Sequence, residues 1–138
     1  MKKNKLLIKN NVSELEKVSV FVEKIVSDFK ISDKLIFNVN LVLEEIISNI
    51  IFYAFDDESD HEILIEAILI DNDLQILIKD DGKAFNLLDA PVPTDLNAGI
   101  DDRNIGGLGI HFAKTLMDNI DYKRENNKNI LILRKQIS

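Results

Sequence analysis

The sequence predicts an α+β fold, a two-layer sandwich in which helices cover one face of a mixed, mostly antiparallel sheet. Apolar residues recur at helical spacing from Leu15 to Tyr53, β-rich runs follow at 61–70 and 74–80, and further strands close the chain. Because strands and helices do not alternate strictly, a parallel βαβ architecture is not expected. A length of 138 residues with 46% hydrophobic residues is enough for one core, so we expect a single domain over 1–138.

The first predicted elements are a strand, Lys5–Lys9, and a helix. Ser13 and Glu16 have the spacing of a capping box, in which each side chain bonds a free backbone N–H of the first turn. The helix is expected from about Ser13 to Lys30. Its apolar residues recur at helical intervals and are Leu15, Val18, Val22, Ile25, Val26 and Phe29.

A second helix follows, and Ser32 is placed to cap it. The helix should end in the acidic run Asp56–Asp60. One apolar stripe runs along it, formed by Leu35, Val39, Val42, Leu43, Ile46, Ile50 and Tyr53.

The next two runs, HEILIEAILI and LQILIKD, are rich in β-branched and aliphatic residues and predict a hairpin. Asp71, Asn72 and Asp73 join them, and such residues tolerate turn geometry. The residues expected to face the core are Ile63, Ile65, Ala67 and Leu69.

Periodicity disappears from Phe85 to Ile105, a segment that contains both prolines of the chain. So long an irregular segment in a compact domain is usually a functional lid or disordered. After the sequence GGLG a third helix is expected, followed by strands at Ile120–Arg124 and Ile130–Ile137. The face of that helix is expected to carry Ile110, Ala113, Leu116, Met117 and Ile120.

Composition excludes several functions. A net charge of −7 argues against nucleic acid as a partner, because phosphate-binding surfaces are usually basic. The absence of cysteine excludes disulfides and thiolate chemistry, and two histidines leave little for a zinc site. The basic start has too short an apolar run for a signal peptide, and no membrane span is expected. We therefore expect a cytoplasmic protein with no membrane partner.

Two polar residues interrupt the apolar stretch LVLEEIISNIIFYAF of the second helix. At about 100° per residue, Glu45 and Asn49 fall together on the rim of the buried face. A carboxylate and a carboxamide one turn apart can meet a ligand there without burying an unpaired charge. The alternative is a solvated stripe or a simple helix pair.

The end of the second hairpin strand, IKDDGKAF, is a further candidate. Asp80 at a strand end can accept a hydrogen bond from an amine, and Gly82 permits a sharp turn and close approach of a flat ligand. The alternative is ordinary turn chemistry.

The third candidate is NIGGLGIHFAKTLMD, where Gly106, Gly107 and Gly109 precede a helix. Free backbone N–H groups and the helix dipole favour phosphate at such an entrance. Two common phosphate motifs fail, because Phe112 and Ala113 stand where the dinucleotide fingerprint and the P-loop require glycine. A turn that serves helix packing is the alternative.

Taken in order, these three elements resemble the GHKL-type ATPase fold, specifically the anti-sigma-factor serine-protein kinase family and its stand-alone relatives. They look like that family's N box and its first and second glycine boxes, and the resemblance covers nearly the whole chain. The residues concerned are Glu45, Asn49, Tyr53 and Ala54, then Asp80, Gly82 and Phe85, then Gly106, Gly107, Leu108, Gly109 and Ile110.

The resemblance implies a Bergerat-type ATP-binding fold and a role for each motif. Asn49 would ligate Mg²⁺, and Glu45 would be the general base that accepts the proton of an attacking hydroxyl. Asp80 would accept from the adenine amino group, and Gly82 would leave space for the ring. The implied phosphate contacts are Gly107, Gly109 and the cation Arg103. Further nucleotide-binding positions are Ala54, Phe85, Gly106 and Leu108, and the lid would span about 86–105.

The implied function is an ATP- and Mg²⁺-dependent regulatory kinase that phosphorylates a serine on an anti-sigma factor antagonist of the STAS type. A sigma factor as a bound target and a homodimer are further expectations, the latter because both faces of the last strand are apolar. The alternative is a non-catalytic module whose protein contacts depend on nucleotide. Tyr53 and Ala84 depart from residues common in the family, and neither change removes an expected phosphate or metal contact.

Overall fold

A computed structural model describes residues 2–57, 59–84 and 113–137. Five strands form one sheet: β1 (Lys2–Lys9), β2 (Glu62–Ile70), β3 (Asp73–Asp80), β4 (Asn119–Glu125) and β5 (Lys128–Gln136). Their order in the sheet is β1-β2-β3-β5-β4. All four strand pairings are antiparallel, so the described sheet is antiparallel throughout, where the sequence analysis expected a mixed, mostly antiparallel one.

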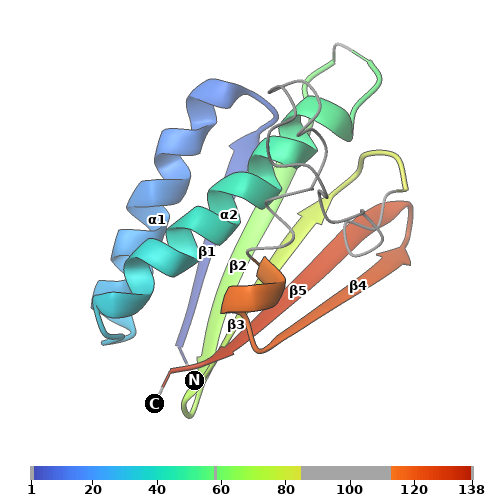
Figure 1. The fold of residues 1–138 in the computed structure, drawn as a ribbon. Helices are drawn as coiled ribbons and strands as arrows, with labels where there is room; N and C mark the ends of the chain where they lie inside the picture. Colours follow the sequence, from blue (N-terminus) through green and yellow to red (C-terminus); the bar gives the residue numbers. More distant parts are fainter. Residues whose placement is uncertain (1, 58, 85–112, 138) are drawn as a thin grey trace, which may run out of the picture.

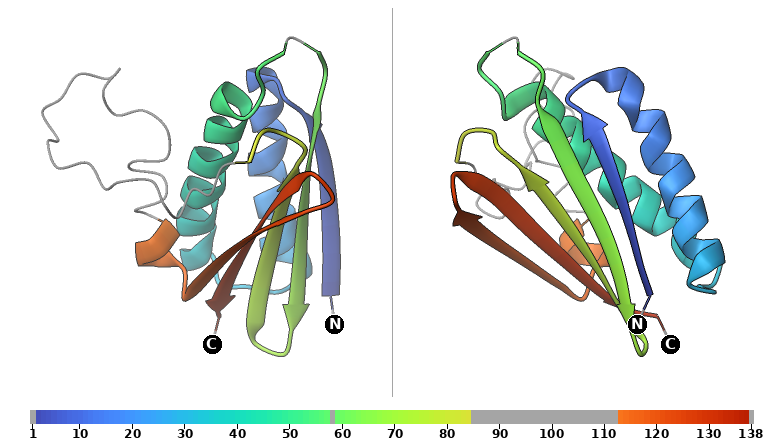
Figure 2. Two further views of the ribbon diagram at one scale, coloured as in Figure 1. Left: turned by 90° about the vertical axis from the view of Figure 1, so that its right-hand side faces the viewer. Right: turned by 180° about the vertical axis from the view of Figure 1, so that it is seen from behind.

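Two helices, α1 (Leu15–Asp28) and α2 (Lys34–Tyr53), cover one face of this sheet (Figure 1). The edge-on view in Figure 2 shows the helices in one layer and the strands in the other. One continuous apolar core joins the two layers, with Leu43, Ile65 and Leu133 among its fully buried side chains. The α+β two-layer fold expected from the sequence is therefore confirmed.

The entrance to α1 differs from the expected capping box. A 3₁₀ helix, η1 (Val12–Glu14), precedes α1, and the side chain of Asn11 accepts a hydrogen bond from the Ser13 N–H at 3.1 Å. Ser13 thus lies inside the first helical turn and cannot cap it. Asn11 caps the 3₁₀ helix instead, α1 itself has no side-chain cap, and the capping-box prediction is wrong.

The other boundaries are shifted by a few residues. β1 begins at Lys2 rather than Lys5, and α1 ends at Asp28, two residues before the left-handed Lys30. The Ser32 hydroxyl does accept from the N–H of Lys34, at 3.2 Å, as α2 begins. Ile120 belongs to β4 and not to a helix face, because helix is present only over 113–116 in the described part of that region.

The β2–β3 hairpin is confirmed. A two-residue turn separates Ile70 from Asp73, and Asp71 takes the left-handed backbone conformation that this turn needs. The alternate residues Ile63, Ile65, Ala67 and Leu69 are buried against the helices, as the period-two pattern predicted.

Helix α2 is twenty residues long, and an eighteen-residue window within it has a mean hydropathy of 1.6, so by length and composition alone it could cross a membrane. The sequence analysis expected no such segment. Six of its side chains are buried in the core, and core helices pass the same test by length and composition. Within that window 33% is buried, and a single helix of this kind is weak evidence for a membrane span.

Candidate functional site

Three segments that are distant in the sequence meet at one end of the sheet. They are the carboxyl end of α2, the end of β3 and the hairpin between β4 and β5 (Figure 1). The meeting is fixed by register, because Asp80, the last residue of β3, lies directly opposite Asn129 near the start of β5. On the other side of β5, Asn129 lies opposite Arg124 of β4.

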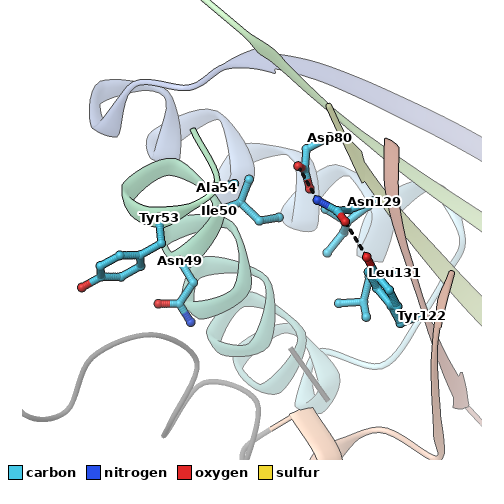
Figure 3. Close-up of a pocket in the computed structure, with 9 residues that line it drawn as sticks. Asn49, Ile50, Tyr53, Ala54, Asp80, Tyr122, Asn129 and Leu131 are labelled. Carbon is cyan, nitrogen blue, oxygen red and sulfur yellow. Dashed lines mark hydrogen bonds between the residues drawn. The ribbon is translucent and has the colours of Figure 1, made fainter. Parts of the chain in front are cut away.

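A pocket opens between these segments (Figure 3). One wall comes from α2 and the residue after it, and the opposite wall comes from β3, β4 and β5. Most of the lining is apolar or aromatic, with three polar side chains among it. The lining residues are Asn49, Ile50, Tyr53, Ala54, Ile78, Asp80, Tyr122, Asn129 and Leu131.

The carboxyl group of Asp80 is the buried polar group of this pocket, with only 4% of the residue exposed. Its Oδ1 accepts hydrogen bonds from the Gly82 backbone N–H at 2.8 Å and from Asn129 Nδ2 at 3.1 Å. Burial raises the pKa of this carboxyl above its ordinary value, while these two hydrogen bonds act in the opposite direction. Within the described residues no donor reaches Oδ2, so this oxygen is available to a ligand.

Gly82 is held against the end of α2. The next residue, Lys83, donates its backbone N–H to the carbonyl of Ala54 at 2.9 Å. A Cβ at Gly82 would lie 2.6 Å from that carbonyl oxygen and 2.7 Å from the Ala54 Cβ. Contact within the protein therefore explains the glycine, and Gly82 does not line the described pocket, although Ala54 does.

The two polar residues of α2 lie at the rim of the buried face, as helix geometry predicted. Glu45 and Asn49 are both half-buried. Asn49 lines the pocket, whereas Glu45, one turn earlier, does not. Figure 3 shows the Tyr53 ring pointing away from Asp80 on the α2 side.

The structure brings together Asn49, Ala54 and Asp80 in one pocket, with Gly82 directly behind Asp80. The remaining candidates lie outside the described residues, as does the expected lid at 86–105. These candidates are Phe85, Arg103, Gly106, Gly107, Leu108 and Gly109.

Sequence reasoning missed Asn129, Tyr122 and Arg124, which form hydrogen bonds around Asp80. The signal for Asn129 was a polar residue at the start of the apolar run NILILRK. That signal has meaning only once β5 is known to pair with β3 in the register that places Asn129 opposite Asp80.

Comparisons with known proteins agree with this architecture. A family model described as "Histidine kinase-like ATPase domain" matches residues 8–135. The serine-protein kinase RsbW of Listeria monocytogenes serovar 1/2a is 30% identical over 86 residues, which cover 60% of this chain and 55% of that protein. RsbW of Bacillus mycoides is 29% identical over 98 residues, which cover 69% of this chain and 61% of that protein. The matched part of the chain thus corresponds to little more than half of these relatives.

Two solved structures share the fold. The RsbU and RsbW domains of Rv1364c from Mycobacterium tuberculosis superpose with a TM-score of 0.70 at 12% identity, over 99% of this chain and 33% of that chain. A blue-light activated histidine kinase, EL346 of Erythrobacter litoralis, gives a TM-score of 0.61 at 15% identity, over 91% of this chain and 41% of that chain. At these identities the similarity concerns the fold alone.

Proposed function

Because this chain belongs to the histidine kinase-like ATPase domain family, as its motifs predicted, we propose that it binds ATP with Mg²⁺ and phosphorylates a serine of a partner protein. The observation that carries the proposal is the Asp80 carboxyl group. It is buried at the floor of an otherwise largely apolar pocket and has one oxygen free of described donors. Such an oxygen suits the amino group of a purine base.

The pocket residues fit the parts of a nucleotide in turn. Ile50, Ile78 and Leu131 provide apolar walls for a flat heterocycle, and Asp80 provides the acceptor for its amino group. Asn49, at the other side of the pocket, presents a side-chain amide oxygen, the kind of ligand that Mg²⁺ takes beside phosphate oxygens. The metal would neutralise phosphate charge during transfer.

Glu45 is proposed as the general base. It lies one helical turn before Asn49 on the same rim, so a substrate hydroxyl that approaches the metal-bound phosphate would come near its carboxylate. A carboxylate in that position accepts the hydroxyl proton as the oxygen attacks phosphorus. The name shared by the relatives, serine-protein kinase, supports a serine as the acceptor.

The partner proposed for this chain is an anti-sigma factor antagonist of the STAS type, with a sigma factor as a second target. The similarity to RsbW supports this class of partner. The net charge of −7 is consistent with a protein partner rather than nucleic acid. Such a regulator would act in the cytoplasm.

Calorimetric titration with ATP, with and without Mg²⁺, tests the nucleotide site. We expect metal-dependent binding that weakens at least about ten-fold in Asp80→Asn, since the change replaces a buried charged acceptor with a neutral amide. Asp33→Asn is the matched control, because Asp33 is exposed, lies at the start of α2 and does not line the pocket. Absence of ATP binding to the unmodified protein would refute the proposal.

The Asn49→Ala variant tests the metal ligand in the same titrations. We expect it to lose the Mg²⁺-dependent part of ATP affinity while the fold persists, because Asn49 is only half-buried. Thermal unfolding monitored by circular dichroism supplies the check on the fold. ATP binding that retains its full dependence on Mg²⁺ would contradict the assignment.

A non-catalytic, nucleotide-dependent interaction module is the second candidate. The position of Glu45 favours it, because this side chain does not line the described pocket. Transfer of labelled phosphate from ATP to the partner separates the two functions. For the kinase, Glu45→Gln should keep ATP affinity and lose transfer, and transfer at the normal rate would exclude Glu45 as the base.

A further inference from the structure

The side-chain amide of Asn129 connects the pocket to the edge strand of the sheet. Asn129 is 7% exposed and lies opposite Asp80 in the β3–β5 register. Its Nδ2 donates to Asp80 Oδ1 at 3.1 Å and to the Lys83 carbonyl at 2.8 Å. Its Oδ1 accepts from the Tyr122 hydroxyl at 2.6 Å and from Arg124 Nη1 at 3.1 Å. The dashed lines in Figure 3 mark the bonds to Asp80 and Tyr122.

These four partners determine which way the amide points. A guanidinium can only donate, so the atom beside Arg124 must be the oxygen. A carbonyl can only accept, so the atom beside Lys83 O must be the nitrogen. Rotation of the amide by 180° would place its oxygen against both the Asp80 carboxylate and this carbonyl. The network therefore fixes the Nδ2 donor toward Asp80.

Arg124 also holds the segment that follows Asp80. Its Nη1 donates to the Gly82 carbonyl at 2.7 Å, and the Gly82 N–H in turn bonds Asp80 Oδ1. Both described donors to the carboxylate thus reach Oδ1, from β5 and from the turn after β3. With Oδ1 held on two sides, the plane of the carboxylate is set and Oδ2 remains as the oxygen available to a ligand.

The charge of Asp80 matters as much as its orientation. A neutral carboxyl group could carry its proton on Oδ2, and this proton would oppose the amino group of a ligand. Burial favours the neutral form, whereas donors to the carboxylate favour the charged form. Of the neighbouring charges, Asp81 favours the neutral form and Arg124 the charged form. Asp80 and Asp81 also line a polar groove, and the other ionisable side chains that line this groove with them are Asp60, His61, Glu62, Lys79 and Lys128.

We propose that Asn129, held by Tyr122 and Arg124, is a positioning residue that keeps Asp80 an ionised acceptor toward the pocket and so sets a preference for bases with an amino group. This inference rests on the proposed nucleotide site and assigns the basis of its selectivity to residues outside the three sequence motifs. A site built to bond an amino group discriminates against an analogue that lacks it, because its own buried polar group is then left unpaired.

The first test follows Asp80 itself and needs no nucleotide. In protein with ¹³C-labelled aspartate, the carboxyl resonance of Asp80 reports its titration directly. Loss of the Asn129 donor should raise the pKa of Asp80 in Asn129→Ala. Asn129→Asp should raise it further, because a second carboxylate then faces the first. Asn119→Ala, at an exposed position on β4, is the control and should titrate as the unmodified protein does.

The second test compares ATP with purine riboside 5′-triphosphate, which lacks the 6-amino group. The unmodified protein should prefer ATP by about ten-fold or more at neutral pH, the value expected for one hydrogen bond to a charged group. Asn129→Ala should lose most of this preference while its affinity for the analogue changes little. On acidification, the ATP affinity of this variant should also begin to fall at a higher pH than that of the unmodified protein. A purely structural defect would lower the affinities for ATP and for the analogue equally and would leave the pH dependence of ATP affinity unchanged.

A milder variant covers the case in which Asn129→Ala does not fold. Tyr122→Phe removes one hydroxyl donor to Asn129 and should shift the Asp80 titration in the same direction by a smaller amount. An unchanged titration of Asp80 in every folded variant, or an unchanged ATP preference in Asn129→Ala, would overturn the positioning role. If the unmodified protein binds neither nucleotide, the proposed function fails, and the carboxyl titration still decides the role of Asn129.

Discussion

At the scale of one residue, packing within the protein explains why position 82 is a glycine, whereas the sequence analysis explained this glycine by the approach of a ligand. In the sequence analysis, the absence of a side chain at Gly82 was expected to leave space for an adenine ring. In the structure the space where a Cβ would stand is taken by Ala54 and by the Asp80 carboxylate, whose Oδ1 would be 2.9 Å away. A contact between the end of α2 and the turn after β3 therefore requires the glycine and also supports Asp80.

Gly82→Ala is accordingly expected to destabilise the free protein, before any ligand is considered. Forcing a methyl group into this contact should lower the free energy of unfolding by about 1–3 kcal/mol, the usual cost of overpacking. Urea denaturation measures it. Lys83→Ala is the control, because Lys83 is exposed and its contact with Ala54 comes from the backbone, so a change within about 0.5 kcal/mol is expected. Equal stability of Gly82→Ala and the unmodified protein would contradict this account.

At the scale of elements, His61 joins the segment after α2 to the end of β3. Its Nε2 contacts the Asp57 carboxylate at 2.7 Å and its Nδ1 contacts Asp81 at 3.0 Å. The ring also stacks on Phe55, with centroids 4.3 Å apart. A carboxylate at each ring nitrogen favours the doubly protonated imidazolium. The hydrogen bond to Asp57 is the largest cause that raises the pKa of His61 above 6.5, and the contact with Asp81 adds to it.

The raised pKa predicts how stability depends on pH. Because the folded protein holds the proton more tightly, the stabilisation is fully present below the ordinary pKa of 6.5 and is lost as pH rises through the folded pKa. The difference in melting temperature between the unmodified protein and His61→Gln should therefore be largest in mild acid and shrink at alkaline pH. Parallel melting curves at several pH values measure it.

The pKa of Asp57 is lowered, chiefly by its hydrogen bonds from Ser59 and His61, so that strong acid should also weaken this connection. The Asp57–His61 contact is thus expected to stabilise the fold only between the titrations of its two partners. A constant difference in melting temperature across this range would show that His61 acts through packing on Phe55 alone.

At the scale of the whole molecule, the described helices cover one face of the sheet and leave the other uncovered (Figure 2). The uncovered face carries apolar side chains near its middle. Leu77 and Ile132, which pair across β3 and β5, are half-buried, and Leu7 on the edge strand is 54% exposed. An apolar sheet face of this kind is consistent with the homodimer expected from the sequence, which stays a prediction.

Ile132→Glu tests that expectation. A charge at the middle of the face should abolish self-association if two copies pack there, because the carboxylate would be buried without a partner. Sedimentation equilibrium gives the mass of the protein in solution. Lys123→Glu, on the exposed edge strand β4, introduces the same side chain and should leave the mass unchanged. A dimer that persists in Ile132→Glu would exclude this face.

The sequence by itself determined the class of fold, the order of the α-helices α1 and α2 and of the five strands, and the family. These depend on local signals: helical periodicity in α1 and α2, alternation in β2 and β3, and three ordered motifs. It also placed Glu45 and Asn49 at the rim of α2, because the angle between residues on one helix follows from its geometry.

Only the tertiary structure decided what surrounds Asp80. Asn129 is 49 residues away along the chain, and the apolar pattern of β5 would fit a sheet in more than one register. The pairing of β3 with β5 fixes that register and places the amide opposite the carboxylate. The close approach of Gly82 to Ala54 likewise depends on how α2 lies on the sheet, which is decided by packing of the whole core and not by any local pattern.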